Sequence, residues 1–132
     1  MEPIILDTGV VSSILTGELP GPVAARLAGH RPAITFVTVG ELTKWQELRC
    51  WGPRRRAALE RWLNRVAVLP ATPEVARKWG EITAFAALRG CPRPAADTWI
   101  AACCLAYETP LATLNRKDFA DFADHEGLTV IG

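Results

Sequence analysis

The chain has 132 residues, of which 49% are hydrophobic and 22% charged, a balance that excludes disordered, fibrous and coiled-coil chains. Fifteen basic residues stand against fourteen acidic ones, so the net charge of +1 indicates no particular partner. No apolar run reaches the roughly 18 residues of a membrane span, and the N-terminus does not resemble a signal peptide. We therefore expect one cytoplasmic domain spanning residues 1–132.

Short β-type runs alternate with longer amphipathic segments along the whole chain. In chain order, the first half predicts a strand over 4–6, helices over 10–15 and 23–27, a strand over 33–36, and helices over 38–49 and 53–65. The second half predicts a strand over 67–69, helices over 73–86 and 95–107, a strand over 111–113, a helix over 117–122 and a strand over 128–131. This alternation favours an α/β fold, a three-layer α/β/α sandwich with a central, mainly parallel sheet.

Acidic side chains follow the predicted strands or open the neighbouring helices. They are Asp7 after the first strand, Glu41 after the second, Asp97 in the helix before the fourth, and Asp118 after the fourth, where the neutral amide of Asn115 also lies. Ligands of open parallel sheets bind beyond the carboxyl ends of the strands. Each carboxylate alone has a structural explanation, because acids near helix N-termini cap free N–H groups. Asp7 ends a buried strand, so its charge requires a specific partner.

Taken together, the carboxylates predict a cation site. Several carboxylates at one end of a sheet would raise one another's pKa unless a cation lay among them. Mg²⁺ and Mn²⁺ prefer such oxygen ligands, and an ion held there can activate water for attack on phosphorus. The four cysteines form no Cys-x-x-Cys pair and neither histidine lies near them, which argues against structural zinc. No Gly-x-Ser-x-Gly elbow or Gly-rich phosphate loop is present.

Basic residues concentrate in one window, although the whole chain is nearly neutral. They are Lys44, Arg49, Arg54, Arg55, Arg56, Arg61 and Arg65. The window is either a phosphate-contacting surface or a solvated helix face. Trp45 and Trp51 flank the arginine-rich stretch, and they either stack on unpaired bases, anchor a protein partner, or pack in the core or a dimer interface.

Four segments resemble, in order and spacing, the motifs of PIN domains, and in particular the VapC toxins of bacterial toxin–antitoxin pairs. They are Ile5–Thr8 (ILDT), Val39–Leu42 (VGEL), Ala96–Ala102 (ADTWIAA) and Thr113–Phe119 (TLNRKDF). The third and fourth are quite specific together, and the resemblance runs from about Ile4 to Ile131. It implies a compact α/β/α fold and an Mg²⁺- or Mn²⁺-dependent endoribonuclease.

The resemblance also implies roles for individual residues. Asp7, Glu41 and Asp97 match metal-binding acids, Asp118 matches the acid of an Asn-x-x-Asp-Phe segment, and Asn115 matches its polar residue, which some relatives replace with Asp. Thr8 matches a hydroxyl position expected to orient the first acid. The expected partners are a VapB-like antitoxin, a second copy of the chain in a homodimer, and a tRNA or rRNA substrate. The residues expected to contact the sugar–phosphate backbone of this RNA are Arg49, Arg54, Arg55, Arg56 and Arg116.

Two other functions remain open at this point. One is a non-catalytic PIN-like module that binds RNA or a protein, although acids at all four positions argue against a decayed site. The other is a DNA nuclease, since carboxylate-bound metals do not themselves recognise a 2′-hydroxyl group. Metal-stimulated cleavage would distinguish a nuclease from the binding module. Comparing RNA with DNA of the same sequence would distinguish a ribonuclease from a DNA nuclease.

Overall fold

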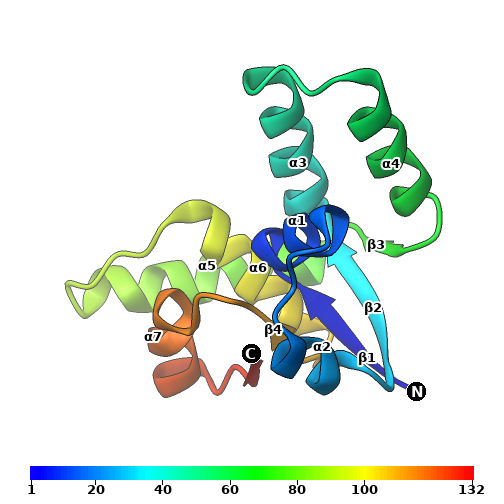
Figure 1. Cartoon of the computed structure of the whole chain (residues 1–132). Helices are drawn as coiled ribbons and strands as arrows, with labels where there is room; N and C mark the ends of the chain where they lie inside the picture. The colour runs from blue at the N-terminus through cyan, green and yellow to red at the C-terminus, as the bar shows by residue number, and fades with distance from the viewer.

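Five parallel strands form one sheet at the centre of the molecule (Figure 1). The structure is a computed structural model that describes residues 1–132. The strand order is β3-β2-β1-β4-β5, so the first strand lies in the middle. In chain order the strands are β1 (Glu2–Leu6), β2 (His30–Thr35), β3 (Ala67–Leu69), β4 (Leu111–Ala112) and β5 (Val130–Ile131).

Seven helices cover the two faces of this sheet. They are α1 (Thr8–Thr16), α2 (Gly21–Leu27), α3 (Phe36–Leu48), α4 (Pro53–Leu63), α5 (Pro73–Leu88), α6 (Ala95–Ala106) and α7 (Arg116–Glu126). Successive side chains of a strand point to opposite faces, and β1 shows this directly. Ile5 belongs to an apolar cluster with residues of α5, α6 and α7, whereas Ile4 and Leu6 belong to a cluster with residues of α1, α3 and α4. The predicted three-layer α/β/α sandwich is confirmed.

The expected order of strands and helices is confirmed. Several boundaries differ, and three of them have a clear local cause or consequence. Phe36 was expected to end a strand, but it is the first residue of α3 because the Thr35 hydroxyl caps that helix, accepting from the Thr38 N–H at 3.4 Å. The last helix continues past Phe122 to Glu126 and ends where Gly127 adopts φ +75°. The fourth strand ends at Ala112, which leaves Thr113 at the sheet edge. None of the helices is long and apolar enough to span a membrane.

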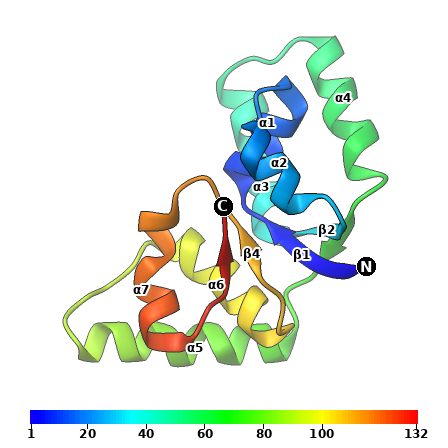
Figure 2. The same ribbon diagram turned by 60° about the horizontal axis from the view of Figure 1, so that its bottom comes forward.

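Helices α3 and α4 form an arm that projects from the rest of the molecule (Figures 1 and 2). We call residues 36–63 the helical arm. Arg56 stabilises the turn between α3 and α4. It donates to the Trp51 carbonyl oxygen at 2.7 Å, the Gln46 carbonyl oxygen at 3.2 Å and the Glu47 carboxylate at 2.9 Å. Trp51 itself is 6% exposed and lies in the apolar cluster of β1, α1 and α3. The arm is therefore packed against the domain through its inner face.

Candidate active site

The carboxyl ends of β2, β1 and β4 lie side by side. Parallel pairing places Leu6 opposite Ala112 and Ile5 opposite Ala33, so the residues that follow these strands emerge at one edge. The chain passes from β3 at one side of β1 to β4 at the other, which makes the β1–β4 junction a topological switch point. Ligands of open α/β sheets bind at such points.

Five threonines are buried as whole residues, and most of them lie at this edge. The five are Thr8, Thr35, Thr38, Thr98 and Thr113. A buried hydroxyl needs a hydrogen-bond partner. At this edge the partners of Thr8 and Thr113 include the carboxylates of Glu41 and Asp7, so the threonines form a supporting layer beneath the acids.

Asp7 is held by hydrogen bonds from two directions. Its Oδ1 accepts from the Thr8 N–H at 2.8 Å, which makes it the N-cap of α1, and its Oδ2 accepts from the Thr113 hydroxyl at 2.9 Å. Burial raises the pKa of Asp7, as does repulsion from Glu41 and Asp118, while the two hydrogen bonds lower it. Asp7 therefore caps a helix and has specific hydrogen-bond partners, while its predicted part in a metal site stays a prediction.

Glu41 lies in the second turn of α3, further into the helix than expected. The Thr8 hydroxyl donates to Glu41 Oε1 at 2.6 Å and lies 3.0 Å from the Thr38 hydroxyl. The expected role of Thr8 therefore needs correction. Its side chain orients Glu41, and only its backbone N–H contacts Asp7, because α1 turns that hydroxyl toward α3.

Asp97 and Asp118 each lie in the first turn of a helix, α6 and α7 respectively. Asp97 is half-buried and accepts no hydrogen bond from the protein. Burial raises its pKa to about 6, with further contributions from repulsion by the three other acids. Asp118 and Asn115 are exposed, and Asn115 occupies the N-cap position of α7 without a side-chain cap bond.

The four acids are near enough to repel one another, yet they do not form a closed cage. Repulsion from Glu41 and Asp118 acts on both Asp7 and Asp97. No three His, Cys, Asp or Glu side chains surround one point closely enough to enclose an ion. Mg²⁺ needs no such cage, because it is commonly bound through one or two carboxylates and retains several waters. The oxygen-only donor set, with an unpartnered half-buried carboxylate at Asp97, fits a hydrated divalent cation.

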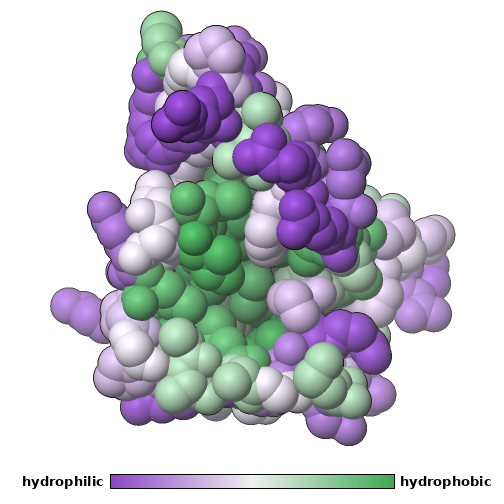
Figure 3. Space-filling model, turned by 45° about the vertical axis from the view of Figure 1, so that its right-hand side comes forward, coloured by the Kyte–Doolittle hydropathy of each residue, from purple (hydrophilic) through white to green (hydrophobic).

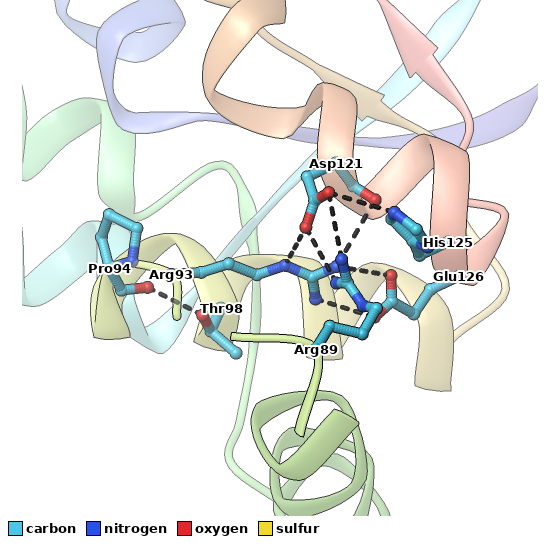
Figure 4. A network of polar contacts seen from close by, with 7 residues as sticks. All are labelled: Arg89, Arg93, Pro94, Thr98, Asp121, His125 and Glu126. Carbon is cyan, nitrogen blue, oxygen red and sulfur yellow. Dashed lines mark hydrogen bonds and ion pairs between the residues drawn. The ribbon is translucent and has the colours of Figure 1, made fainter. Parts of the chain in front are cut away.

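A buried arginine fixes α6 relative to α7 (Figure 4). Arg93, in the loop before α6, donates to both oxygens of Glu126 at 2.7 and 2.9 Å and to Asp121 at 2.7 Å. Its guanidinium also lies 4.1 Å from the ring centroid of Phe122, and its side chain is 5% exposed. Because Asp97 opens α6 and Asp118 opens α7, this cluster positions two of the four acids. Sequence reasoning missed both Arg93 and Thr113.

The arginines expected to contact RNA differ in their availability. Arg49, Arg54 and Arg55 are exposed on the helical arm, and Arg116 is exposed at the start of α7 beside Asn115. Arg56 instead uses its hydrogen bonds within the arm. Arg56 therefore has a structural role in the arm in place of the expected RNA contact.

A model of the PIN domain family matches residues 4–125, and the chain belongs to that family. No curated protein matches the sequence. The fold is similar to a chain of VapBC-1 from nontypeable Haemophilus influenzae, with a TM-score of 0.78 and 26% identity over 96% of this chain and 95% of that one. The fold is also similar to VapBC-5 from Mycobacterium tuberculosis, a member of the VapBC family of toxin–antitoxin systems. The TM-score is 0.75 and the identity 26%, over 99% of this chain and 98% of that one.

A third structure, DNA-bound VapBC from Salmonella typhimurium, has a TM-score of 0.85 at 23% identity, covering 98% of this chain and 97% of that chain. At this identity the likeness concerns the fold alone. The expected resemblance to VapC-like PIN domains is thus confirmed by the family match and by the structural neighbours.

Proposed function

We propose that the chain is a metal-dependent endoribonuclease and the toxin of a toxin–antitoxin pair, with residues 1–132 forming a single nuclease domain. One observation carries the proposal. Four carboxylates at the starts of four helices or within them, Asp7, Glu41, Asp97 and Asp118, lie near the switch point of a PIN-domain sheet, close enough for repulsion to raise the pKa of Asp7 and Asp97. Such a concentration of like charge destabilises a fold unless a cation compensates it.

Mg²⁺ or Mn²⁺ would be held by these four acids, with Asn115 as a neutral oxygen ligand. A divalent ion in such a site supplies Lewis acidity for water and for the phosphate. The chain's own groups keep the acids in place. Thr113 orients Asp7, Thr8 orients Glu41, and the Arg93 cluster sets the spacing of the helices that bear Asp97 and Asp118.

The proposed substrate is a structured RNA, tRNA or rRNA, which would place the activity in the cytoplasm. The support is the resemblance to VapC toxins together with the exposed arginines of the arm and Arg116. These side chains lie on the helical arm that begins with the acid-bearing α3, and at the start of α7, which bears Asp118. Guanidinium groups suit phosphate contacts because they offer several donors in one plane.

The proposed protein partners are a VapB-like antitoxin and a second copy of the chain. The similar solved structures include VapBC toxin–antitoxin structures. An apolar groove of about 230 Å³ between α1, α2 and the sheet suits an apolar segment of the antitoxin. Its apolar lining includes Ile4, Leu6, Ile14, Leu19 and Leu27. Figure 3 shows a broad apolar area below the hydrophilic upper part of the molecule, and such areas mark protein interfaces.

The surface of α5 suits the second copy of the chain. Phe85 is 57% exposed and Leu88 is 83% exposed, and both line a hollow of about 530 Å³ between α5 and α7. Large apolar side chains at this exposure favour burial against a partner. Light scattering of the purified chain should give the mass of a dimer, and Leu88→Asp should give that of a monomer.

The test of the nuclease is cleavage of RNA and of DNA of the same sequence, with Mg²⁺, with Mn²⁺ and with EDTA. We expect discrete RNA fragments that require the metal and no DNA cleavage. Equal cleavage of DNA would contradict the assignment as a ribonuclease and indicate a nuclease that acts on both RNA and DNA. Binding without cleavage of any cellular RNA would favour the PIN-like binding module.

A further inference from the structure

The helical arm carries an excess of positive charge, with six basic residues against three acidic ones. Of its basic residues, only Arg56 forms an ion pair, with Glu47 at 2.9 Å. The first turn of α4 contains Arg54, Arg55 and Arg56, contains no acid, and has Gly52 as its cap without a side-chain bond. Cations at a helix N-terminus oppose the helix dipole. This unfavourable arrangement is expected where an anionic partner neutralises the charge.

A stripe of side chains on α3 leads from the acid site to this charge. Glu41, Trp45 and Arg49 are spaced four residues apart, so they share one face of the helix. The Arg49 guanidinium lies 4.7 Å from the ring centroid of Trp45. At 1.5 Å rise per residue, Arg49 lies about 12 Å along α3 from Glu41. A strand bound at the acids would reach it after a few nucleotides, at about 3.4 Å per stacked nucleotide.

A second arginine–tryptophan pair lies at the start of α4. The Arg55 guanidinium is 3.8 Å from the ring centroid of Trp51, and Trp51 is only 6% exposed. Of the alternatives for Trp51, packing in the core is confirmed, so the buried ring does not itself stack on bases. Arg55 is exposed and rests on that ring. A guanidinium placed over a ring at this distance, and exposed on its other side, is available to an unpaired base and to phosphate.

We propose that the arm binds an unpaired RNA strand that flanks the scissile phosphate, an inference that rests on the proposed nuclease function. Arg54 and Arg55 contact its phosphates, and its bases stack on the Arg49–Trp45 pair and on the Arg55 guanidinium that Trp51 supports. A duplex keeps its bases stacked inside and presents mainly phosphate and sugar. The arm therefore selects a single-stranded loop over a helix of the same RNA.

The test measures RNA binding in EDTA, so that no cleavage occurs. Fluorescence anisotropy compares a labelled single-stranded RNA with the same strand in a duplex, across a salt series. Arg54→Gln with Arg55→Gln should weaken binding to the single strand about tenfold and reduce the salt slope by about 1.4, because each phosphate that the protein neutralises adds about 0.7 to that slope. The matched control is Arg77→Gln, which removes an exposed arginine without an ion pair on α5 and should leave binding unchanged.

Charge-preserving variants separate stacking from charge. Arg49→Lys and Arg55→Lys keep the cation and remove the planar guanidinium, so each should weaken single-strand binding several-fold and leave duplex binding almost unchanged. Equal losses on both RNAs would overturn the selection of unpaired strands. Unchanged binding by all arm variants would overturn the proposal and leave an acidic protein segment as the partner of this charge.

The two proposals fail in different ways. A chain that binds RNA through the arm but cleaves none with Mn²⁺ would contradict the nuclease and retain the RNA-binding arm. A chain that cleaves RNA, and whose arm variants bind RNA as the unmodified chain does, would contradict only the arm.

Discussion

Thr113 donates its hydroxyl hydrogen to Oδ2 of Asp7 at 2.9 Å, joining the end of β4 to the end of β1 across 106 positions of sequence. The same hydroxyl oxygen accepts from the Asn115 N–H at 3.0 Å. One buried side chain thus connects the first acid to the turn that leads to Asp118. The geometry of the site depends on this junction as well as on the acids themselves.

Thr113→Val should move the acid limb of the cleavage profile to higher pH. The Thr113 hydrogen bond lowers the pKa of Asp7, so its removal raises that pKa further, and metal binding needs the deprotonated acid. The rate should fall most at acidic pH and recover in alkaline buffer. Cleavage rates measured from pH 5 to pH 9 check this. An acid limb at the same pH as that of the unmodified chain would contradict the role of Thr113.

Asp97→Asn should stabilise the metal-free chain. In the unmodified chain the pKa of the Asp97 carboxyl rises from an ordinary 3.8 to about 6, so the folded state disfavours the charged form. The stability of that chain therefore declines as the pH rises from about 4 to about 6. At pH 7.5 in EDTA, removal of this charge should add about 1 kcal/mol after allowance for solvent screening, or roughly 3–5 °C in Tm.

Calorimetry with Mn²⁺ completes that experiment. The metal should raise the Tm of the unmodified chain and raise that of Asp97→Asn much less, because the variant lacks one of the metal ligands. A lower Tm for Asp97→Asn in EDTA would show that the carboxylate stabilises the fold and would argue against a site built for a cation.

Arg93→Met should destabilise the chain by about 2–4 kcal/mol, because it leaves the partly buried carboxylate of Glu126 without its bidentate partner. Methionine retains an apolar stem against Phe122. Arg93→Lys should recover only part of the loss, since an ammonium cannot pair with both oxygens of Glu126. Urea unfolding measures both variants. A loss below about 0.5 kcal/mol for Arg93→Met would contradict the importance of the cluster.

Asp121 should make the stability of the chain sensitive to acid. Hydrogen bonds from Arg89 and Arg93 lower its pKa to about 2, so its contribution is present above the ordinary value of about 4 and is lost as the pH falls from about 4 to about 2. The difference in Tm between the unmodified chain and Asp121→Asn should shrink across this range. A difference that stays constant down to pH 2 would contradict the ion pairs.

Local pattern was sufficient to predict the elements and the acids. Each strand contains a short apolar run and the helices follow apolar spacing. Asp7 follows a strand, and Asp97 and Asp118 lie in first helical turns, whereas Glu41 lies one turn further into α3 than predicted. The support of the site depends on register. Nothing in the sequence near Asp7 indicates that Thr113 reaches it, because that contact requires β4 to pair beside β1.

Solvent exposure was similarly beyond local prediction. Trp45 and Trp51 both flank the arginines, yet the turn of the arm buries Trp51 in the core and leaves Trp45 half-exposed. Arg93 shows the same limit. It lies in a proline-rich loop that predicts exposure, and only the packing of α7 encloses it.

The central claim is tested most directly by comparing Asp7→Asn with Asp124→Asn. Asp124 is exposed on α7 and forms no ion pair, so its variant controls for the loss of one negative charge. Both purified variants and the unmodified chain are incubated with total cellular RNA and Mn²⁺. We expect Asp124→Asn to cleave as the unmodified chain does and Asp7→Asn, still folded by circular dichroism, to cleave nothing. Full metal-dependent cleavage by Asp7→Asn would contradict the account.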